Sequence, residues 1–293
     1  MGEIRLKIFS DYTDPTGAKG SFRSWGLGET TYKNLTVVDD ESYTHACIFN
    51  HGNLPKLKVP KEKVVGFHQE VFELIDMRKH RSWLDQNVGT YYVYDLRYMN
   101  GPNIKEWYTF LPNIPLAKDL SVYNNTQKPF PMSIIASSKK FLDGHRFRHE
   151  IINKILRSSM DIHIYGRGSK ELYPLDNRVK GQIEDKTIAF KNYKLTVAIE
   201  NKIMPYWITE KFVDPLICGC VPLYYGAQHI GKVFGDESFY RLPETPDAAF
   251  NLIAKAYENA NEYYRNKNYK VAQEKLLNEA NFAEFIIKHF EEK

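Results

Sequence analysis

The sequence predicts an α/β protein with two Rossmann-like domains facing a cleft, followed by C-terminal helices. Its 293 residues exceed what one compact core usually holds and suit two domains of about 100–150 residues each. A Pro- and Asn-rich passage over 111–131 interrupts the pattern near the middle. In the second half, apolar strands alternate with helices, which is typical of a parallel sheet covered on both faces.

Short apolar runs predict strands throughout the first half, whereas helical periodicity between them is weak. The predicted strands cover residues 4–10, 35–39, 45–50, 63–70 and 91–96. We expect one domain over residues 1–115 and a connection over 116–130.

The second half has the clearer pattern, and we expect a second domain over 131–270 and a C-terminal helix over 271–293. A helical apolar face recurs within 145–159, and Gly219 is expected to end a helix that begins near residue 208. The predicted order is strand 132–137, helix 145–159, strand 161–166, strand 194–201, helix 208–219, strand 220–226, a short helix, strand 238–242, and helices from 246 onward.

Composition excludes several classes of protein. The net charge of +4 is small and no basic stripe dominates, which argues against a nucleic-acid binder. Cys47, Cys218 and Cys220 suit buried free thiols better than a disulfide framework or a zinc site. No apolar window approaches the ~18 residues of a membrane span, and the N-terminus lacks a signal-peptide block. We therefore expect a cytoplasmic protein.

Polar residues cluster where the predicted strand 194–201 ends and the next helix begins. Glu200 and Asn201 lie at the carboxyl end of that strand, where ligands of parallel sheets bind. Thr209 is a candidate N-cap, and Glu210 suits the positive end of the helix dipole. Lys211 opposes that dipole, so it indicates either a solvated side chain or a bound anion such as phosphate.

A second basic cluster, residues 139–150, contains Arg146 and Arg148 at a strand-to-helix junction. It fits either a solvated basic loop or a phosphate site. The P-loop spacing is absent around 165–170, and no G-x-G-x-x-G follows the first strand, which disfavours a dehydrogenase. No D-x-D motif occurs and no His/Cys group has metal-ligand spacing, so we expect no metal site.

Several spaced motifs of the second half occur together in one known family. They are "RHEIINKI" with Arg148, "IHIYGRG", "YKLTVAIEN" and "WITEKFVDPLICGCVPLYYG". In this order they resemble the donor domain of the α1,3-fucosyltransferases of glycosyltransferase family 10. The resemblance covers residues 131–245, whereas the first half is similar only in outline. It implies a GT-B architecture, GDP-fucose as donor and inversion at the anomeric carbon, with no cofactor.

The resemblance also implies roles for individual residues. Arg148 and Lys211 match the cations that hold the donor diphosphate. Asn201 and Glu210 match positions that hold nucleoside or fucose hydroxyls, with Thr209 beside them in the donor-binding segment. Trp207 stands where the family usually has Tyr, so only its indole N–H is left to donate. Lys202 also departs from the family's usual small polar residue, and Glu200 is interpreted as a structural carboxylate beneath the site.

The general base is expected in the first domain, which would bind the acceptor. Glu70, directly after the predicted strand 63–70, matches the family's catalytic Glu best, with Glu73 and Asp76 as competitors. His68 is interpreted as a neighbour of the base. A carboxylate suits the role because it must take the proton of the attacking hydroxyl.

The sequence therefore predicts a metal-independent, inverting fucosyltransferase that moves fucose from GDP-fucose to a glycan acceptor, one containing GlcNAc. Two alternatives stay open: an enzyme using another GDP-sugar, and a module that binds nucleotide sugars or glycans without turnover. The acceptor, the linkage and the oligomeric state are not encoded in any motif.

Overall fold

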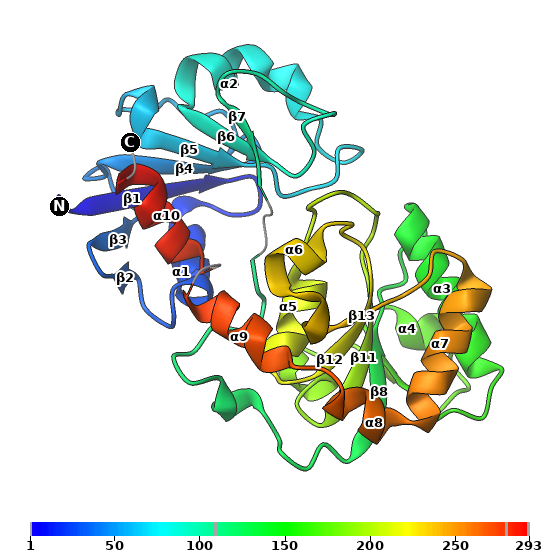
Figure 1. Cartoon of the computed structure of the whole chain (residues 1–293). Coiled ribbons are helices and arrows are strands. Elements are labelled where there is room, and N and C mark those ends of the chain that lie inside the picture. The colour runs from blue at the N-terminus through cyan, green and yellow to red at the C-terminus, as the bar shows by residue number, and fades with distance from the viewer. Residues whose placement is uncertain (1, 108–110, 279–280, 292–293) are drawn as a thin grey trace. The chain divides into compact units, whose positions relative to one another are not determined.

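The computed structural model describes residues 2–107, 111–278 and 281–291, which form two compact units (Figure 1). Unit 1 comprises Met1–Lys118, Pro205–Trp207 and Leu276–Lys293, and unit 2 comprises Asp119–Met204 and Ile208–Lys275. Each unit contains one largely parallel sheet, so the predicted Rossmann-like α/β class is confirmed for both.

Unit 1 is built on a sheet with the strand order β2-β3-β1-β4-β5-β6-β7, in which only β2 pairs antiparallel among the described strands. Parallel strands need crossover connections, and these include the helices α1 (Pro15–Trp25) and α2 (Arg81–Asn87). The strands are β1 Ile4–Ser10, β2 Thr31–Tyr32, β3 Leu35–Val38, β4 His45–Phe49, β5 Val64–Phe67, β6 Thr90–Val93 and β7 Ile104–Glu106.

One face of this sheet is covered by helices from the two ends of the chain. Phe22 of α1 packs with Phe282 and Ile286 of α10 (Phe282–Glu291), and all three are buried. Figure 1 shows the red α10 beside α1 on this sheet. The core of unit 1 therefore includes residues from positions near 20 and near 285, and it is closed only when both helices are in place.

Unit 2 has the strand order β10-β9-β8-β11-β12-β13, and every strand pair in it is parallel. Its strands are β8 Phe130–Ile135, β9 His163–Tyr165, β10 Val179–Gly181, β11 Tyr193–Ile199, β12 Val221–Tyr225 and β13 Tyr240–Arg241. Its helices are α3 Asp143–Leu156, α4 Ser169–Leu172, α5 Glu210–Ile217, α6 Ile230–Phe234, α7 Pro246–Glu258 and α8 Ala260–Arg265, with α9 Tyr269–Asn278 running from its end.

The apolar stripe predicted for 145–159 becomes the buried face of α3. Ile151, Ile152 and Ile155 pack with Ala249 and Ile253 of α7 against the sheet. Thr209 caps α5, as predicted, and Gly219 adopts a left-handed conformation with φ +60° directly after that helix. Cys47, Cys218 and Cys220 are buried and unpaired by disulfides.

The structure contains several elements that were not predicted. The helices α1, α2 and α4 are among them, since α1 contains two glycines and α2 and α4 are short. The strands β2, β7 and β10 were also missed. The predicted strand 63–70 ends at Phe67, so that His68–Glu70 leave the sheet as a loop.

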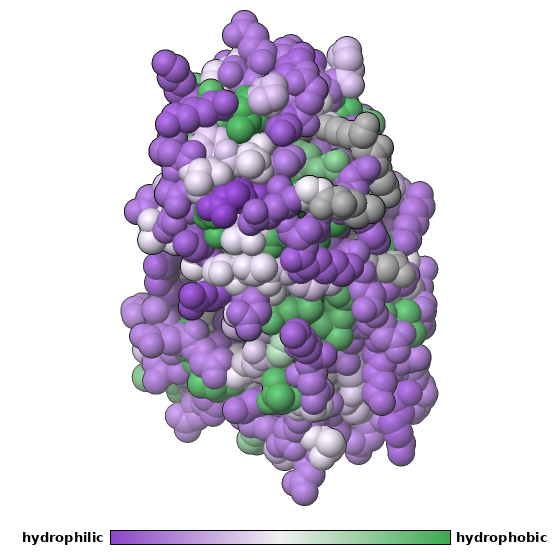
Figure 2. Space-filling model, turned by 90° about the vertical axis from the view of Figure 1, so that its left-hand side faces the viewer, coloured by the Kyte–Doolittle hydropathy of each residue, from purple (hydrophilic) through white to green (hydrophobic). Residues whose placement is uncertain are grey.

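Within the described residues, no helix combines the length and the apolarity that a bilayer crossing requires. Figure 2 shows one face of the molecule, on which hydrophilic side chains predominate and hydrophobic ones form separate small patches.

Arg178 ties the C-terminal end of α3 to the start of β10. Its guanidinium pairs with the Asp176 carboxylate at 2.7 Å. It also donates to carbonyl oxygens at the end of α3 and just beyond, at 2.6–3.1 Å: Ile155, Leu156, Ser158 and Met160. The last carbonyls of a helix lack partners within the helix, so this side chain satisfies them.

We expect Arg178→Met to lower the free energy of unfolding of unit 2 by about 2–4 kcal/mol, since several charge-assisted hydrogen bonds are lost together. Urea unfolding followed by circular dichroism measures the change. Lys180→Met is the matched control, because Lys180 is exposed and, among the described residues, donates only to the nearby Asn177 carbonyl. Equal stability of the two variants would contradict the assigned role.

Candidate functional site

The strand order of unit 2 reverses between β8 and β11, and both strands end at the same edge of the sheet. Helix α3 follows β8, and Asn201 follows β11. In doubly wound sheets, ligands bind outside the carboxyl ends of the strands at such a reversal point. The predicted donor-binding residues of unit 2 come from the segments that leave this edge.

Arg148 projects from α3 toward the end of β11 and is only 3% exposed. One of its terminal nitrogens, Nη2, donates to the Ile199 carbonyl at 2.6 Å and to Asn201 Oδ1 at 3.1 Å. Its Nε is buried and has no hydrogen-bond partner among the described residues. Burial lowers the pKa of Arg148 to about 10, although Glu200 and Glu210 act in the opposite direction. A buried guanidinium with an unused donor is suited to an anionic ligand.

The contact between α3 and the end of β11 requires glycine at position 144. The Gly144 backbone N–H donates to the Asn201 carbonyl at 2.9 Å. A Cβ at position 144 would lie 1.9 Å from the Glu200 carbonyl oxygen, which is too close for two non-bonded atoms. No residue with a side chain therefore fits at this position. This close approach brings the first turn of α3, and with it Arg148, against Asn201.

Glu200 is a fully buried carboxylate at the centre of the site. Its Oε1 accepts from the Thr209 N–H at 3.0 Å, the Thr209 hydroxyl at 2.9 Å and the Tyr224 hydroxyl at 3.3 Å. Lys211 Nζ lies 3.5 Å from its Oε2. Burial raises the pKa of Glu200, while Lys211 and the Thr209 hydrogen bonds oppose that shift. Its contacts attach the start of α5 to β11 and β12.

The first turn of α5 holds a second pair of opposite charges. Lys211 Nζ lies 3.3 Å from Glu210 Oε1. Burial opposes the charge of Lys211, but Glu210 and Glu200 outweigh it and raise the pKa of Lys211. Burial also opposes ionisation of Glu210, but Lys211 and Lys186 outweigh it and lower the pKa of Glu210 to about 2. Both side chains are therefore charged near neutral pH.

Lys186 was not predicted as a site residue, and it approaches from a short 3₁₀ helix, Lys186–Ala189. Its Nζ lies 3.8 Å from Glu210 Oε1 and 3.7 Å from Asp214 Oδ2. Nothing in the sequence around Lys186 distinguishes it from the other lysines, because its partners are more than twenty residues away. The carboxyl edge of unit 2 thus gathers Arg148, Lys186 and Lys211, which can together hold a phosphate-bearing ligand.

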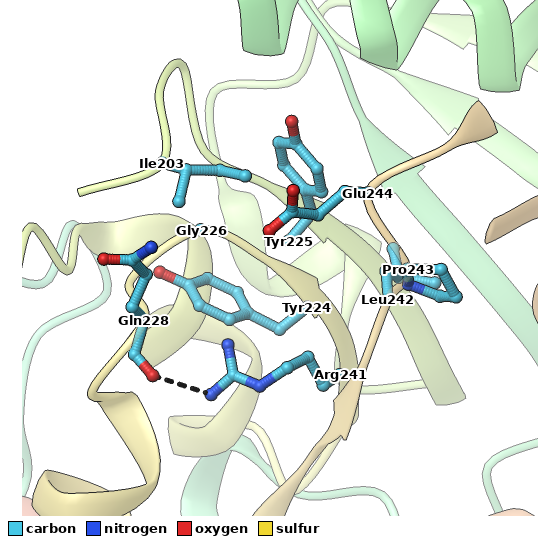
Figure 3. A pocket seen from close by; sticks show the side chains of 9 residues that line it. All are labelled: Ile203, Tyr224, Tyr225, Gly226, Gln228, Arg241, Leu242, Pro243 and Glu244. Atoms are coloured by element: carbon cyan, nitrogen blue, oxygen red, sulfur yellow. Dashed lines mark hydrogen bonds between the residues drawn. The ribbon is translucent and has the colours of Figure 1, made fainter. Parts of the chain in front are cut away.

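A pocket of about 290 Å³ opens beside this cluster at the ends of β12 and β13. Figure 3 shows the Tyr225 ring and the Glu244 carboxylate facing the same space, and Arg241 donating to the Gln228 carbonyl. Tyr224 lines the pocket and also reaches Glu200. The pocket residues are Ile203, Tyr224, Tyr225, Gly226, Gln228, Arg241, Leu242, Pro243 and Glu244.

Trp207 belongs to the short segment Pro205–Trp207, which groups with unit 1. The ring is 2% exposed, and its indole N–H donates to the Gln69 carbonyl at 3.1 Å. The Trp207 indole N–H, which we expected to bind the donor nucleotide, is therefore bonded to a carbonyl of unit 1 in this structure.

Glu70 follows β5 in unit 1 and is half-buried. Its carbonyl oxygen accepts from the Tyr94 hydroxyl at 2.7 Å. Its competitor Asp76 is bound to Arg78 and to the Tyr98 hydroxyl, and these two groups hold the pKa of Asp76 well below its usual range.

The other two residues considered near the base differ in exposure. Glu73 is exposed, and His68 is fully buried with its Nε2 3.1 Å from the Ile75 carbonyl. Burial lowers the pKa of His68 to about 4, so this imidazole is neutral at pH 7. Glu70 thus lies at the carboxyl edge of the sheet, with a half-buried side chain and a main chain held by a hydrogen bond.

The family model described as "Glycosyltransferase family 10 (fucosyltransferase) C-term" matches residues 131–285, which is more than half of the chain. This chain belongs to glycosyltransferase family 10. The matched region contains β8 to β13, the cationic cluster around Glu200 and the pocket beside it. The resemblance found in the sequence motifs is thereby confirmed.

A curated fucosyltransferase is similar to part of this chain. Alpha-(1,3)-fucosyltransferase B of Drosophila melanogaster is 31% identical over 96 residues, which are 29% of this chain and 21% of that protein. The match thus spans about a fifth of the length of that curated relative.

Two solved structures match nearly the whole chain. An α1,3-fucosyltransferase crystallised with GDP-fucose is 14% identical over 97% of this chain and 90% of that one, with a TM-score of 0.52. Anabaena Alr3699/HepE in complex with UDP-glucose is 12% identical over 99% of both chains, with a TM-score of 0.63. At these identities the likeness shows the fold, which is the GT-B type expected from the sequence.

We expect Glu200→Ala to lower the free energy of unfolding of unit 2 by about 3–5 kcal/mol, because it opens a cavity and leaves the Thr209, Tyr224 and Lys211 donors without their partner. Denaturant unfolding measures this value. Glu258→Ala on α7 is the control, since Glu258 is exposed. A change below about 1 kcal/mol in Glu200→Ala would show that the carboxylate does not hold α5 in place.

Proposed function

We propose that this family 10 protein is an inverting fucosyltransferase, which moves fucose from GDP-fucose to a hydroxyl of a GlcNAc-containing glycan. The observation that carries the proposal is Arg148, a buried cation with an unused N–H at the reversal point of the unit 2 sheet. The family membership and the nearby Lys211 support the same reading. The α1,3 linkage and the GDP-fucose donor are carried over from the family resemblance.

In this proposal the donor diphosphate binds to Arg148 and Lys211. Without ligand, Lys211 is paired with Glu210 and Glu200 at 3.3 and 3.5 Å. Phosphate oxygens approaching the α5 N-terminus add a stronger negative partner for Lys211 and meet the positive end of the helix dipole. Asn201 and Glu210 then offer an amide and a carboxylate to hydroxyl groups of the ribose or the fucose.

The reaction needs one proton transfer and one displacement. Glu70 takes the proton of the acceptor hydroxyl, and the hydroxyl oxygen forms a bond to the anomeric carbon of fucose from the face opposite the leaving group. The bond between that carbon and the phosphate oxygen breaks, and GDP departs with the electron pair. Arg148 and Lys211 stabilise the charge that develops on GDP, so that no divalent metal is required.

Arg148→Met and Lys211→Ala are each expected to weaken GDP-fucose binding about 10- to 100-fold, because a charge-assisted contact to phosphate contributes about 1.5–3 kcal/mol. Isothermal titration calorimetry measures the affinity. Arg146→Ala is the matched control, since Arg146 lies on the same helix but is exposed and paired with Asp143.

Wild-type affinity in both variants would show that Arg148 and Lys211 do not bind the diphosphate and have a structural role instead. The same titration with GDP and with UDP tests the base of the nucleotide, and equal affinities would contradict the guanine assignment. Transfer should also survive a chelator, and its loss with EDTA, restored by a divalent cation, would contradict the metal-independent mechanism.

Glu70→Gln is expected to reduce turnover by about 10²–10⁴ while leaving GDP-fucose affinity nearly unchanged, because it keeps the shape and removes the basicity. GDP release with N-acetyllactosamine as acceptor measures turnover. Glu73→Gln, a change to an exposed carboxylate three residues away, should have little effect. Retention of most of the rate in Glu70→Gln would place the base elsewhere.

A further inference from the structure

Four neighbouring strands of unit 1 end at one edge of its sheet, and each is followed closely by a polar side chain. The strands lie in the order β1, β4, β5 and β6 and are all parallel. The residues that follow them are Tyr12, Asn50, Glu70 and Tyr94. Because parallel strands bring their carboxyl ends to the same edge, residues distant in sequence meet there.

Asn50 connects these segments through every polar group that it has. Its Oδ1 accepts from the N–H groups of Gln69 at 2.9 Å and Glu70 at 3.4 Å. Its Nδ2 donates to the Tyr12 hydroxyl at 3.1 Å. Its backbone N–H donates to the Phe67 carbonyl at 2.8 Å, and its carbonyl accepts from the Tyr91 hydroxyl at 3.0 Å.

The backbone of Asn50 also indicates a fixed position. Asn50 is fully buried and has a φ of +53°, in the left-handed region that most side chains avoid. Asparagine adopts this region more readily than most residues, and the five hydrogen bonds around it hold it there. The amide therefore presents its oxygen to the Glu70 loop and its nitrogen to Tyr12 in one orientation.

Tyr12 completes the connection to the carboxylate. Its ring is exposed, yet its hydroxyl accepts from the buried Asn50 amide, whose oxygen accepts from the Glu70 N–H. Burial of the hydroxyl and the negative charge of Glu70 raise the pKa of Tyr12, so the phenol remains a proton donor. Because the Asn50 N–H donates to the Tyr12 oxygen, the phenol O–H is left to donate to a neighbouring carboxylate, and the charge of Glu70 acts on this phenol.

We propose that Asn50 and Tyr12 are positioning residues for Glu70: Asn50 fixes the main chain that carries the carboxylate, and Tyr12 fixes the carboxylate itself. This inference rests on the proposed function, in which Glu70 is the general base. A half-buried Glu on a loop has three rotatable side-chain bonds, so its carboxylate samples several places unless neighbours hold it. Proton transfer requires one of those places, and a group held there in advance speeds the reaction.

The main chain of Glu70 is held on both sides. Asn50 accepts from its N–H, and the Tyr94 hydroxyl donates to its carbonyl oxygen at 2.7 Å. The preceding carbonyl, that of Gln69, accepts from the Trp207 indole. With the peptide groups fixed in this way, we assign the choice of the Glu70 side-chain rotamer to the Tyr12 phenol.

The experiment is a double-mutant cycle between Tyr12→Phe and Glu70→Gln, with turnover measured as GDP release in the presence of N-acetyllactosamine. Tyr12→Phe removes one hydroxyl and keeps the ring, so folding is preserved. We expect it to lower kcat about tenfold, with the KM for GDP-fucose and the melting temperature unchanged. In the Glu70→Gln background the same substitution should have no further effect, because Tyr12 acts through Glu70.

Asn50→Asp provides the second arm, since aspartate tolerates the left-handed backbone and can still accept from the loop but cannot donate to Tyr12 as the amide does. We expect a loss of kcat at least as large as that of Tyr12→Phe. Tyr32→Phe on β2 is the control, and its kcat should equal that of the wild type.

Two results would overturn this inference but not the proposed function. The first is a wild-type kcat in Tyr12→Phe, and the second is an equal loss of kcat when Tyr12→Phe is made in the wild type and in Glu70→Gln. Full activity of the Glu70→Gln single variant, or no GDP release by the wild-type chain, would instead overturn the proposed function and this inference with it. The cycle thus separates the two failures.

Discussion

The arrangement of both units follows from one constraint, which is that parallel strands cannot be joined by tight turns. Each strand must be followed by a crossover that returns to the opposite edge, so all segments leaving carboxyl ends gather at one edge. In unit 2 this brings Arg148 to Asn201, 53 positions further along the chain, and in unit 1 it brings Asn50 to the loop of Glu70. The polar groups at these edges are positioned by the sheets, whose apolar cores determine where each strand ends.

The charges at the edge of unit 2 are stable because they neutralise one another. Glu200 is fully buried, a location in which an isolated carboxylate would be strongly unfavourable. Thr209, Tyr224 and Lys211 supply the donors that offset this, and Glu210 is shared between Lys211 and Lys186. The network therefore combines two tasks: it attaches α5 to the sheet, and it keeps cations in place for an incoming anion.

Features governed by neighbouring residues could be predicted from the sequence, and features governed by distant ones could not. The Thr209 cap, the end of α5 near Gly219 and the buried face of α3 depend on spacings of a few residues. Helix α1 was missed although Asp14 and Pro15 mark its start. Two internal glycines lower its intrinsic helix stability, and the packing of Phe22 against the sheet restores that stability. Lys186, Asn50 and Tyr12 were missed because their partners lie about twenty or more positions away.

Helix α10 has a consequence for the order in which the protein can be assembled during synthesis. The β-strands of unit 1 leave the ribosome before unit 2, but Phe282 and Ile286, which cover one face of their sheet, leave it after unit 2. Unit 2, whose residues end at Lys275, contains a complete core before then. The nascent chain must therefore carry an uncovered apolar sheet until α10 has been synthesised, and unit 2 can reach its native structure before unit 1 does.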